Sequence, residues 1–156
     1  MKHLLVALLF LLNACSIKDY EHTATKILIL KTPKIKFSDI GYIRNSDSAI
    51  ELELFVAGHV FKRIDINHLI CVEDEGCMSK SSFNAEYFNA SYPDEIFQNI
   101  LLGRKIYGGE NTLKSKSGFI QNIETKDVSI LYRVSQKEIY FKDRKNRILI
   151  KIKEVN

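Results

Sequence analysis

The amino-acid sequence predicts an α+β fold, mostly antiparallel β, in which a curved sheet carries one or two short helices. Apolar residues recur at every second position through much of the chain, which is typical of half-buried strands. Polar turn clusters separate these segments, as in strands that hairpins connect. Residues 92–103 break the period and combine helix start and stop signals. A length of 156 residues is enough for one such domain.

The first residues have the composition of an export signal. Lys2 and His3 precede the apolar residues 4–12, a run far shorter than the roughly 20 residues that span a bilayer. We therefore expect residues 1–14 to be a signal peptide. Leu-Asn-Ala-Cys at residues 12–15 resembles the bacterial lipobox. That resemblance implies cleavage before Cys15 and a diacylglycerol cysteine there, further acylated by a fatty acid such as palmitate, as the membrane anchor.

Ser16 and the polar residues after it indicate how the mature chain is presented. Serine next to the lipidated cysteine resembles the default signal for the outer membrane, so we expect a lipid anchor on its periplasmic face. The polar stretch makes residues 15–25 the lipidated cysteine and a tether. Residues 26–156 are then expected to be a single β-rich domain that faces the periplasm.

The first part of this domain reads as a series of strands. Residues 27–30 are an apolar run, and residues 44–48 are a turn cluster. A half-buried strand follows, with apolar residues that alternate with glutamates. The next strand continues the pattern on one face. Its alternating apolar positions, with those of the strand before it, are Ile50, Leu52, Leu54, Val56, Val60, Ile64 and Ile66.

Cys71 and Cys77 remain once Cys15 is assigned to the anchor, and an even number of cysteines in an exported domain suggests a disulfide. The residues between them are polar and include a glycine, as in a turn, so the bond would pin a hairpin. Free thiols and a metal site with His59 and His68 are the alternatives. That spacing matches no common zinc pattern, so no metal is predicted.

Residues 92–103 have a proline at the expected first turn, acidic residues after it, and Gly103 at the expected end. Residues 83–88 suggest another helical turn before it. Residues 108–118 are rich in glycine and polar side chains and are expected to be a loop. The last third returns to period two, with strands at 128–134, 138–142 and 148–152 and a turn at 143–146.

The order of these parts resembles the LolA/LolB group of lipoprotein carriers and receptors, LolB in particular. A lipobox is followed by a strand meander, a loop with exposed apolar residues, a proline-initiated helix ending in Leu-Leu-Gly, and closing hairpins. The resemblance covers residues 35–155, and residues 92–103 are the most similar stretch. It implies an unclosed β-barrel capped by helices, with an apolar cavity for acyl chains.

The resemblance also implies which residues bind lipid. The candidates for the cavity wall face the same side of their strands, and packing in an ordinary core is the alternative for each. They are Leu52, Leu54, Ile64, Ile66, Ile130, Tyr132, Ile139, Phe141, Ile148 and Ile150. A protruding loop that touches the membrane corresponds to residues 55–59, and Val56 is the candidate for its tip. A tight turn that ends a core strand is the alternative there.

Function is expected to be binding rather than catalysis. The sequence has no nucleophile motif and no phosphate-binding loop, so no enzyme activity and no cofactor are predicted. The formal net charge of +4 is scattered, which does not favour nucleic acid. The specific hypothesis is an outer-membrane lipoprotein that binds acyl chains and receives acylated lipoproteins from a periplasmic carrier protein. The alternative is a non-catalytic adaptor lipoprotein that binds a periplasmic protein partner.

Overall fold

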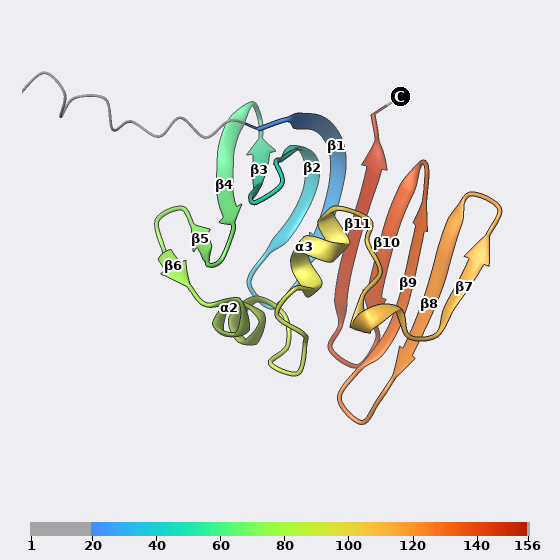
Figure 1. Ribbon diagram of the computed structural model, residues 1–156. Coiled ribbons are helices and arrows are strands. Elements are labelled where there is room, and N and C mark those ends of the chain that lie inside the picture. Colours follow the sequence, from blue (N-terminus) through green and yellow to red (C-terminus); the bar gives the residue numbers. More distant parts are fainter. Residues whose placement is uncertain (1–19, 156) are drawn as a thin grey trace, which may run out of the picture.

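The computed structural model describes residues 20–155, and the predicted signal peptide, Cys15 and the first part of the predicted tether lie outside that range. Eleven strands form one sheet, and two short α-helices and a 3₁₀ turn lie between its halves in the chain (Figure 1). The elements are β1 His22–Lys31, β2 Lys36–Asn45, β3 Ile50–Val56, β4 His59–Ile66, β5 Ile70–Val72, β6 Gly76–Met78, α2 Lys80–Tyr87, α3 Ile96–Leu101, η2 Tyr107–Gly109, β7 Thr112–Ser115, β8 Gly118–Glu124, β9 Ser129–Ser135, β10 Glu138–Asp143 and β11 Ile148–Glu154.

The sheet is antiparallel and unclosed, which confirms the predicted fold class. Its strand order is β6-β5-β4-β3-β2-β1-β11-β10-β9-β8-β7, so two hairpin meanders meet where the first strand pairs with the last. In that central pair Leu28 lies opposite Ile152 and Leu30 opposite Ile150. Figure 1 shows the sheet curving around α2 and α3, which therefore cover its concave face.

Alternation along the strands puts the apolar residues on that concave face. The cross-strand pairs Leu52–Ile64, Phe141–Ile150 and Tyr132–Phe141 all belong to it. A single hydrophobic core forms where this face meets α2 and α3. Because every described strand contributes to one sheet around one core, residues 20–155 contain what an independently folding domain needs.

The helices begin and end for local reasons. Ser79 caps α2, because its hydroxyl accepts a hydrogen bond from the backbone N–H of Ser82 at 3.1 Å. The expectation that Pro93 would be the first residue of the next helix is wrong: α3 begins at Ile96, after a turn in which the N–H of Ile96 bonds the carbonyl of Pro93. Gly103 does end it, with a left-handed φ of +63°.

Two boundaries differ from the sequence prediction. The domain begins before residue 26, because β1 starts at His22 and its polar first residues pair with the end of β2 as far as Asn45. The expected loop at residues 108–118 contains the edge strand β7, which pairs only with β8. Both segments are polar and exposed, so backbone pairing forms them without the apolar alternation that reveals a strand.

Ion pairs cross the convex face where β2, β3 and β4 lie side by side. The carboxylate of Glu53 lies between two guanidinium groups, 2.5 Å from Nη1 of Arg44 and 2.5 Å from Nη2 of Arg63. Burial of Glu53 would raise the pKa of this carboxyl, but the two arginines outweigh burial and hold its pKa below the ordinary value. This network joins β2, β3 and β4 on the side away from the helices.

Candidate functional site: the covered concave face and a basic hollow

All ten predicted lipid-binding residues lie on the concave face. Nine are at most 3% exposed, and the tenth, Ile139, is half-buried and packs against the same core. They come from β3, β4, β9, β10 and β11, so the pattern of alternation brings together residues that are far apart in the chain. The structure places them where a lipid-facing wall would lie, in contact with the helices that cover it.

Aromatic side chains join the cover to the sheet and the two helices to each other. The ring of Tyr92, in the loop between the helices, meets the ring of Phe141 edge to face at 6.0 Å. On α2 and α3, Phe83 stacks on Phe97 with their centroids 5.4 Å apart. The Tyr132 hydroxyl donates a hydrogen bond to the carbonyl of Arg104 at 2.9 Å. In this conformation the helices fill the concavity.

Three of the ten residues also reach the wall of a hollow. Ile139 lines one of about 250 Å³, between the end of α3 and strands β10 and β11, together with Leu101 and Leu102. Ile66 and Ile130 each reach a different hollow near the ends of their strands. The hollows at Ile139 and Ile66 are therefore two places where solvent reaches the boundary between the cover and the sheet, because residues of α3 line both.

A buried carboxylate fixes the cover at the opposite end. Asp143, at the end of β10, is fully buried and accepts hydrogen bonds from the Tyr92 hydroxyl and from Nδ2 of Asn146, both at 2.7 Å. Burial raises the pKa of an isolated carboxyl, but these donors and two backbone amides hold the pKa of Asp143 below its ordinary value. The hydroxyl of Tyr107 is buried without a hydrogen-bond partner, and burial raises its pKa to about 12.

Val56, the predicted membrane-contact residue, is exposed at the tip of the β3–β4 hairpin. Its exposed fraction is 47%, and Phe61 on the same hairpin is 50% exposed. Phe61 stacks on Phe37 of β2 with the ring centroids 6.2 Å apart. The tip therefore presents apolar side chains to solvent, and a tight turn of two residues, 57–58, connects its strands.

Cys71 and Cys77 are directly opposite each other on β5 and β6, and their sulfur atoms are joined in a disulfide 2.00 Å long. The bond closes the edge hairpin immediately before α2. Within residues 20–155 no three histidine, cysteine, aspartate or glutamate side chains are grouped as metal ligands would be. No helix of that range is long and apolar enough to cross a membrane.

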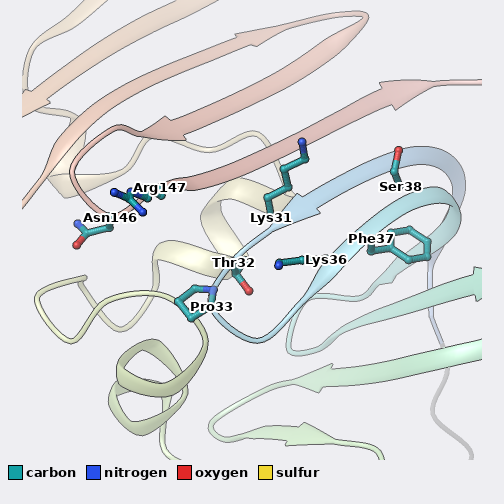
Figure 2. Close-up of a pocket in the computed structure, with 8 residues that line it drawn as sticks. All are labelled: Lys31, Thr32, Pro33, Lys36, Phe37, Ser38, Asn146 and Arg147. Carbon is teal, nitrogen blue, oxygen red and sulfur yellow. The ribbon is translucent and has the colours of Figure 1, made fainter.

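The largest of the described hollows, about 740 Å³, lies outside the concave face, around the turn between β1 and β2 (Figure 2). Its lining includes the exposed Pro33 and a small part of Phe37, which is only 5% exposed, and its charged residues are Lys31, Lys36 and Arg147. The other lining residues are Thr32, Ser38 and Asn146, so no acidic side chain contributes to it. The hollow combines an apolar wall with three cations.

The sequence does not predict this basic hollow. Lys31 and Lys36 flank the short β1–β2 turn, but Arg147 lies on another hairpin, and only the pairing of β1 with β11 brings it close. The one local signal is the pair of lysines on either side of a turn. A solvated turn shows the same pattern, so the signal does not identify a site.

Comparison with known proteins gives no further assignment. No protein-family model matches the chain, and no curated protein or solved structure matches it either. The function is therefore inferred from the sequence pattern and from the geometry of the described residues.

Proposed function

We propose that this protein is a lipoprotein, anchored through Cys15 to the periplasmic face of the outer membrane, that binds acyl chains and receives acylated lipoproteins there in the manner of LolB. The observation that carries the proposal is the cover on the concave face. A continuous apolar wall of strands is closed by two short helices instead of by a second sheet.

Short helices make a cover that can move. The helices α2 and α3 have 8 and 6 residues, and helices of this length have little stability of their own. Their position depends on side-chain contacts with the sheet. An acyl chain that replaces those contacts gains about 0.8 kcal/mol for each buried methylene. The core that is filled in the free protein then becomes the wall of a lipid site.

The ends of the cover are suited to such a movement. The disulfide between Cys71 and Cys77 fixes the hairpin before α2, and Gly103 follows α3 in a left-handed conformation. Between these two points the chain crosses the concave face once. The hollow beside Ile139 lies at the end of α3, which makes it the entrance that the proposal assigns to the acyl chain.

The proposal is tested by native mass spectrometry of residues 16–156 purified from a bacterial periplasm. We expect phospholipid or acylated peptide to co-purify. Ile139→Arg should abolish that binding, because the charged side chain extends into the entrance while remaining solvated. Leu113→Arg, on an edge strand where the side chain is 63% exposed, is the matched control and should retain the lipid.

A ligand-free protein that also takes up no fluorescent fatty acid would contradict the acyl-binding proposal. Circular dichroism of both variants shows whether they remain folded. If they are folded and bind equally well, the entrance at Ile139 is wrong. Amide hydrogen exchange adds an independent readout, since a cover that opens for a fatty acid must change the exchange rates of α2 and α3.

One observation favours the second candidate function, binding of a periplasmic protein partner. Val56, Val60 and Phe61 on the β3–β4 hairpin are each more than 40% exposed, and contiguous exposed apolar side chains are typical of contact surfaces. Replacing Phe61 with aspartate separates the two functions. Loss of a partner with fatty-acid uptake intact would support the adaptor, whereas loss of vesicle binding would assign the hairpin to membrane contact.

A further inference from the structure

We propose that the hollow around the β1–β2 turn binds one molecule of a phosphate-bearing amphiphile, with its phosphate on Lys31, Lys36 and Arg147 and its alkyl chain against Pro33 and the methylene stems of the two lysines (Figure 2). This site is separate from the concave face. The proposal does not rest on acyl binding there.

The positive charge of the hollow favours an anionic ligand. Lys31 and Lys36 are direct partners across β1 and β2, and like charges at opposed positions destabilise a strand pair. Arg147 adds a third cation from the β10–β11 turn. Within residues 20–155 none of the three has an acidic partner, although most other cations of the sheet have one. The chain therefore keeps an unfavourable cluster that an anion would stabilise.

The charge and the acceptor oxygens of a phosphate match this cluster of three cations. A phosphate monoester carries between one and two negative charges near neutral pH and offers three acceptor oxygens. A carboxylate brings one charge to the same three cations. Charge-assisted hydrogen bonds from lysine and arginine to phosphate are among the stronger contacts that proteins form. Phosphate is thus the anion that best neutralises the hollow.

The surface between the three cations is apolar and favours an alkyl chain. Pro33 is apolar and exposed, and the methylene stems of the two lysines extend this surface while their amino groups stay in solvent. A volume of about 740 Å³ falls in the range of sites for small organic ligands. A free phosphate ion would leave most of this wall uncovered, whereas an alkyl phosphate covers it.

The test is calorimetric titration of residues 16–156 with dodecyl phosphate below its micellar concentration. We expect one molecule to bind. The double substitution Lys31→Gln and Lys36→Gln should weaken binding by about tenfold or more, because two charge-assisted contacts are lost. Lys114→Gln with Lys116→Gln changes the net charge equally, on an exposed part of the other meander, and should change the affinity by less than about twofold.

Arg147→Gln is a second variant that leaves the lysine pair intact, and it should also weaken binding. Lys36→Gln removes the like-charge pair, so its melting temperature should not fall while its affinity does. That combination distinguishes a ligand site from a structural role. Binding at the concave face would instead be insensitive to these substitutions and sensitive to Ile139→Arg.

Each remaining outcome overturns the proposal. Equal affinity of the two double variants for dodecyl phosphate would mean that the hollow does not hold the phosphate. Equal binding of inorganic phosphate would show that the free anion is the ligand. Equal binding of dodecyl maltoside would show that the cations contribute nothing. Binding only to phosphatidylglycerol vesicles would identify a membrane surface contact instead of a site for one molecule.

Discussion

The carboxylate of Asp143 connects three parts of the chain that are distant in sequence. It accepts hydrogen bonds from Tyr92 in the loop between the helices, from the backbone N–H of Ser129 at the start of β9, and from Asn146 in its own turn. A buried carboxylate with this many donors is stable only while it is ionised and every donor is in place. This residue therefore determines how the cover is held against one end of the sheet.

Removing this carboxylate should destabilise the whole domain. Asp143→Ala leaves the buried Tyr92 hydroxyl without its acceptor and removes one of the two acceptors of the Asn146 amide, so we expect the free energy of unfolding to fall by about 2–4 kcal/mol. Urea unfolding followed by circular dichroism measures the loss. Asp127→Ala, in the exposed turn before β9, is the control and should change stability by less than about 0.5 kcal/mol.

The depressed pKa of Asp143 also predicts the pH dependence of stability. The ordinary pKa is 3.8 and the folded-state value lies below it, so the folded state binds the proton less readily than the unfolded state. Its contribution to stability is fully present above the unfolded-state pKa and is lost as the pH falls through the folded-state pKa. In urea unfolding at a series of pH values below 5, Asp143→Asn should show a shallower loss than the unsubstituted chain. Equal slopes would contradict this assignment.

Gly41 is a residue whose size matters more than its chemistry. A Cβ added there would lie 2.5 Å from the carbonyl oxygen of Glu53 and 2.5 Å from Cδ1 of Leu28. Gly41→Ala should therefore lower the free energy of unfolding by about 1–3 kcal/mol, as overpacking a core does. Chemical denaturation tests this, and Ser38→Ala on the same strand should be nearly neutral. An unchanged midpoint for Gly41→Ala would mean that the sheet relaxes at little cost.

At the scale of elements, the β5–β6 hairpin is a short edge that the disulfide completes. Each of its strands has three residues, which is too few for stable pairing without another constraint. Cys71 and Cys77 supply that constraint immediately before the cover begins. The hairpin is thus the fixed side from which α2 extends.

Replacing both cysteines with alanine should cost about 2 kcal/mol, because the closed loop is small and the entropy it removes from the unfolded chain is modest. We expect a lower melting temperature and faster amide hydrogen exchange in β5, β6 and the start of α2. Exchange in β1 and β11 should change only as much as global stability does. A collapse of the whole fold in the double variant would show that the bond does more than close a hairpin.

Much of the element pattern could be predicted from the sequence, for a definite reason. Strands β3, β9, β10 and β11 each turn one face toward the core and the other away from it. Apolar residues therefore recur at every second position, which is visible in the sequence. Strand β7 lies at an edge with exposed side chains, so nothing in its pattern separates it from a loop. The predicted start of α3 is wrong because Pro93, three positions before the helix, has the same sequence pattern as a proline in its first turn.

At the scale of the whole molecule, the candidate site could be predicted only in part. Alternation identifies which residues share the concave face, but it carries no information about what lies over that face. The ten residues are therefore predicted to share one wall, while the choice between a lined cavity and a packed core stays open until the structure shows Phe83, Phe97 and Tyr92 in the same core. The basic hollow depends on pairing between the first and last strands, which no local pattern reveals.

Stability should also be uneven across the sheet. The central strands β1 and β11 are paired on both sides, whereas β6 and β7 each have one neighbour within the described residues. Native-state hydrogen exchange should find the slowest amides in β1, β11, β2 and β10 and the fastest in β6 and β7. Uniform protection across the strands would show that the domain opens only by unfolding as a whole.

The pairing of β1 with β11 has a consequence for the order in which the chain can fold. Lys26 and Glu154, which form an ion pair across these strands, are separated by 128 positions. Contacts of such long range form late and slow the folding of a domain. The strands β1 to β6 must therefore wait, with one side of β1 unpaired, until the last strand has emerged. A ribosome or a translocation pore that releases the chain from its N-terminus would hold a half-built sheet, in which one edge of β1 is unpaired until β11 follows.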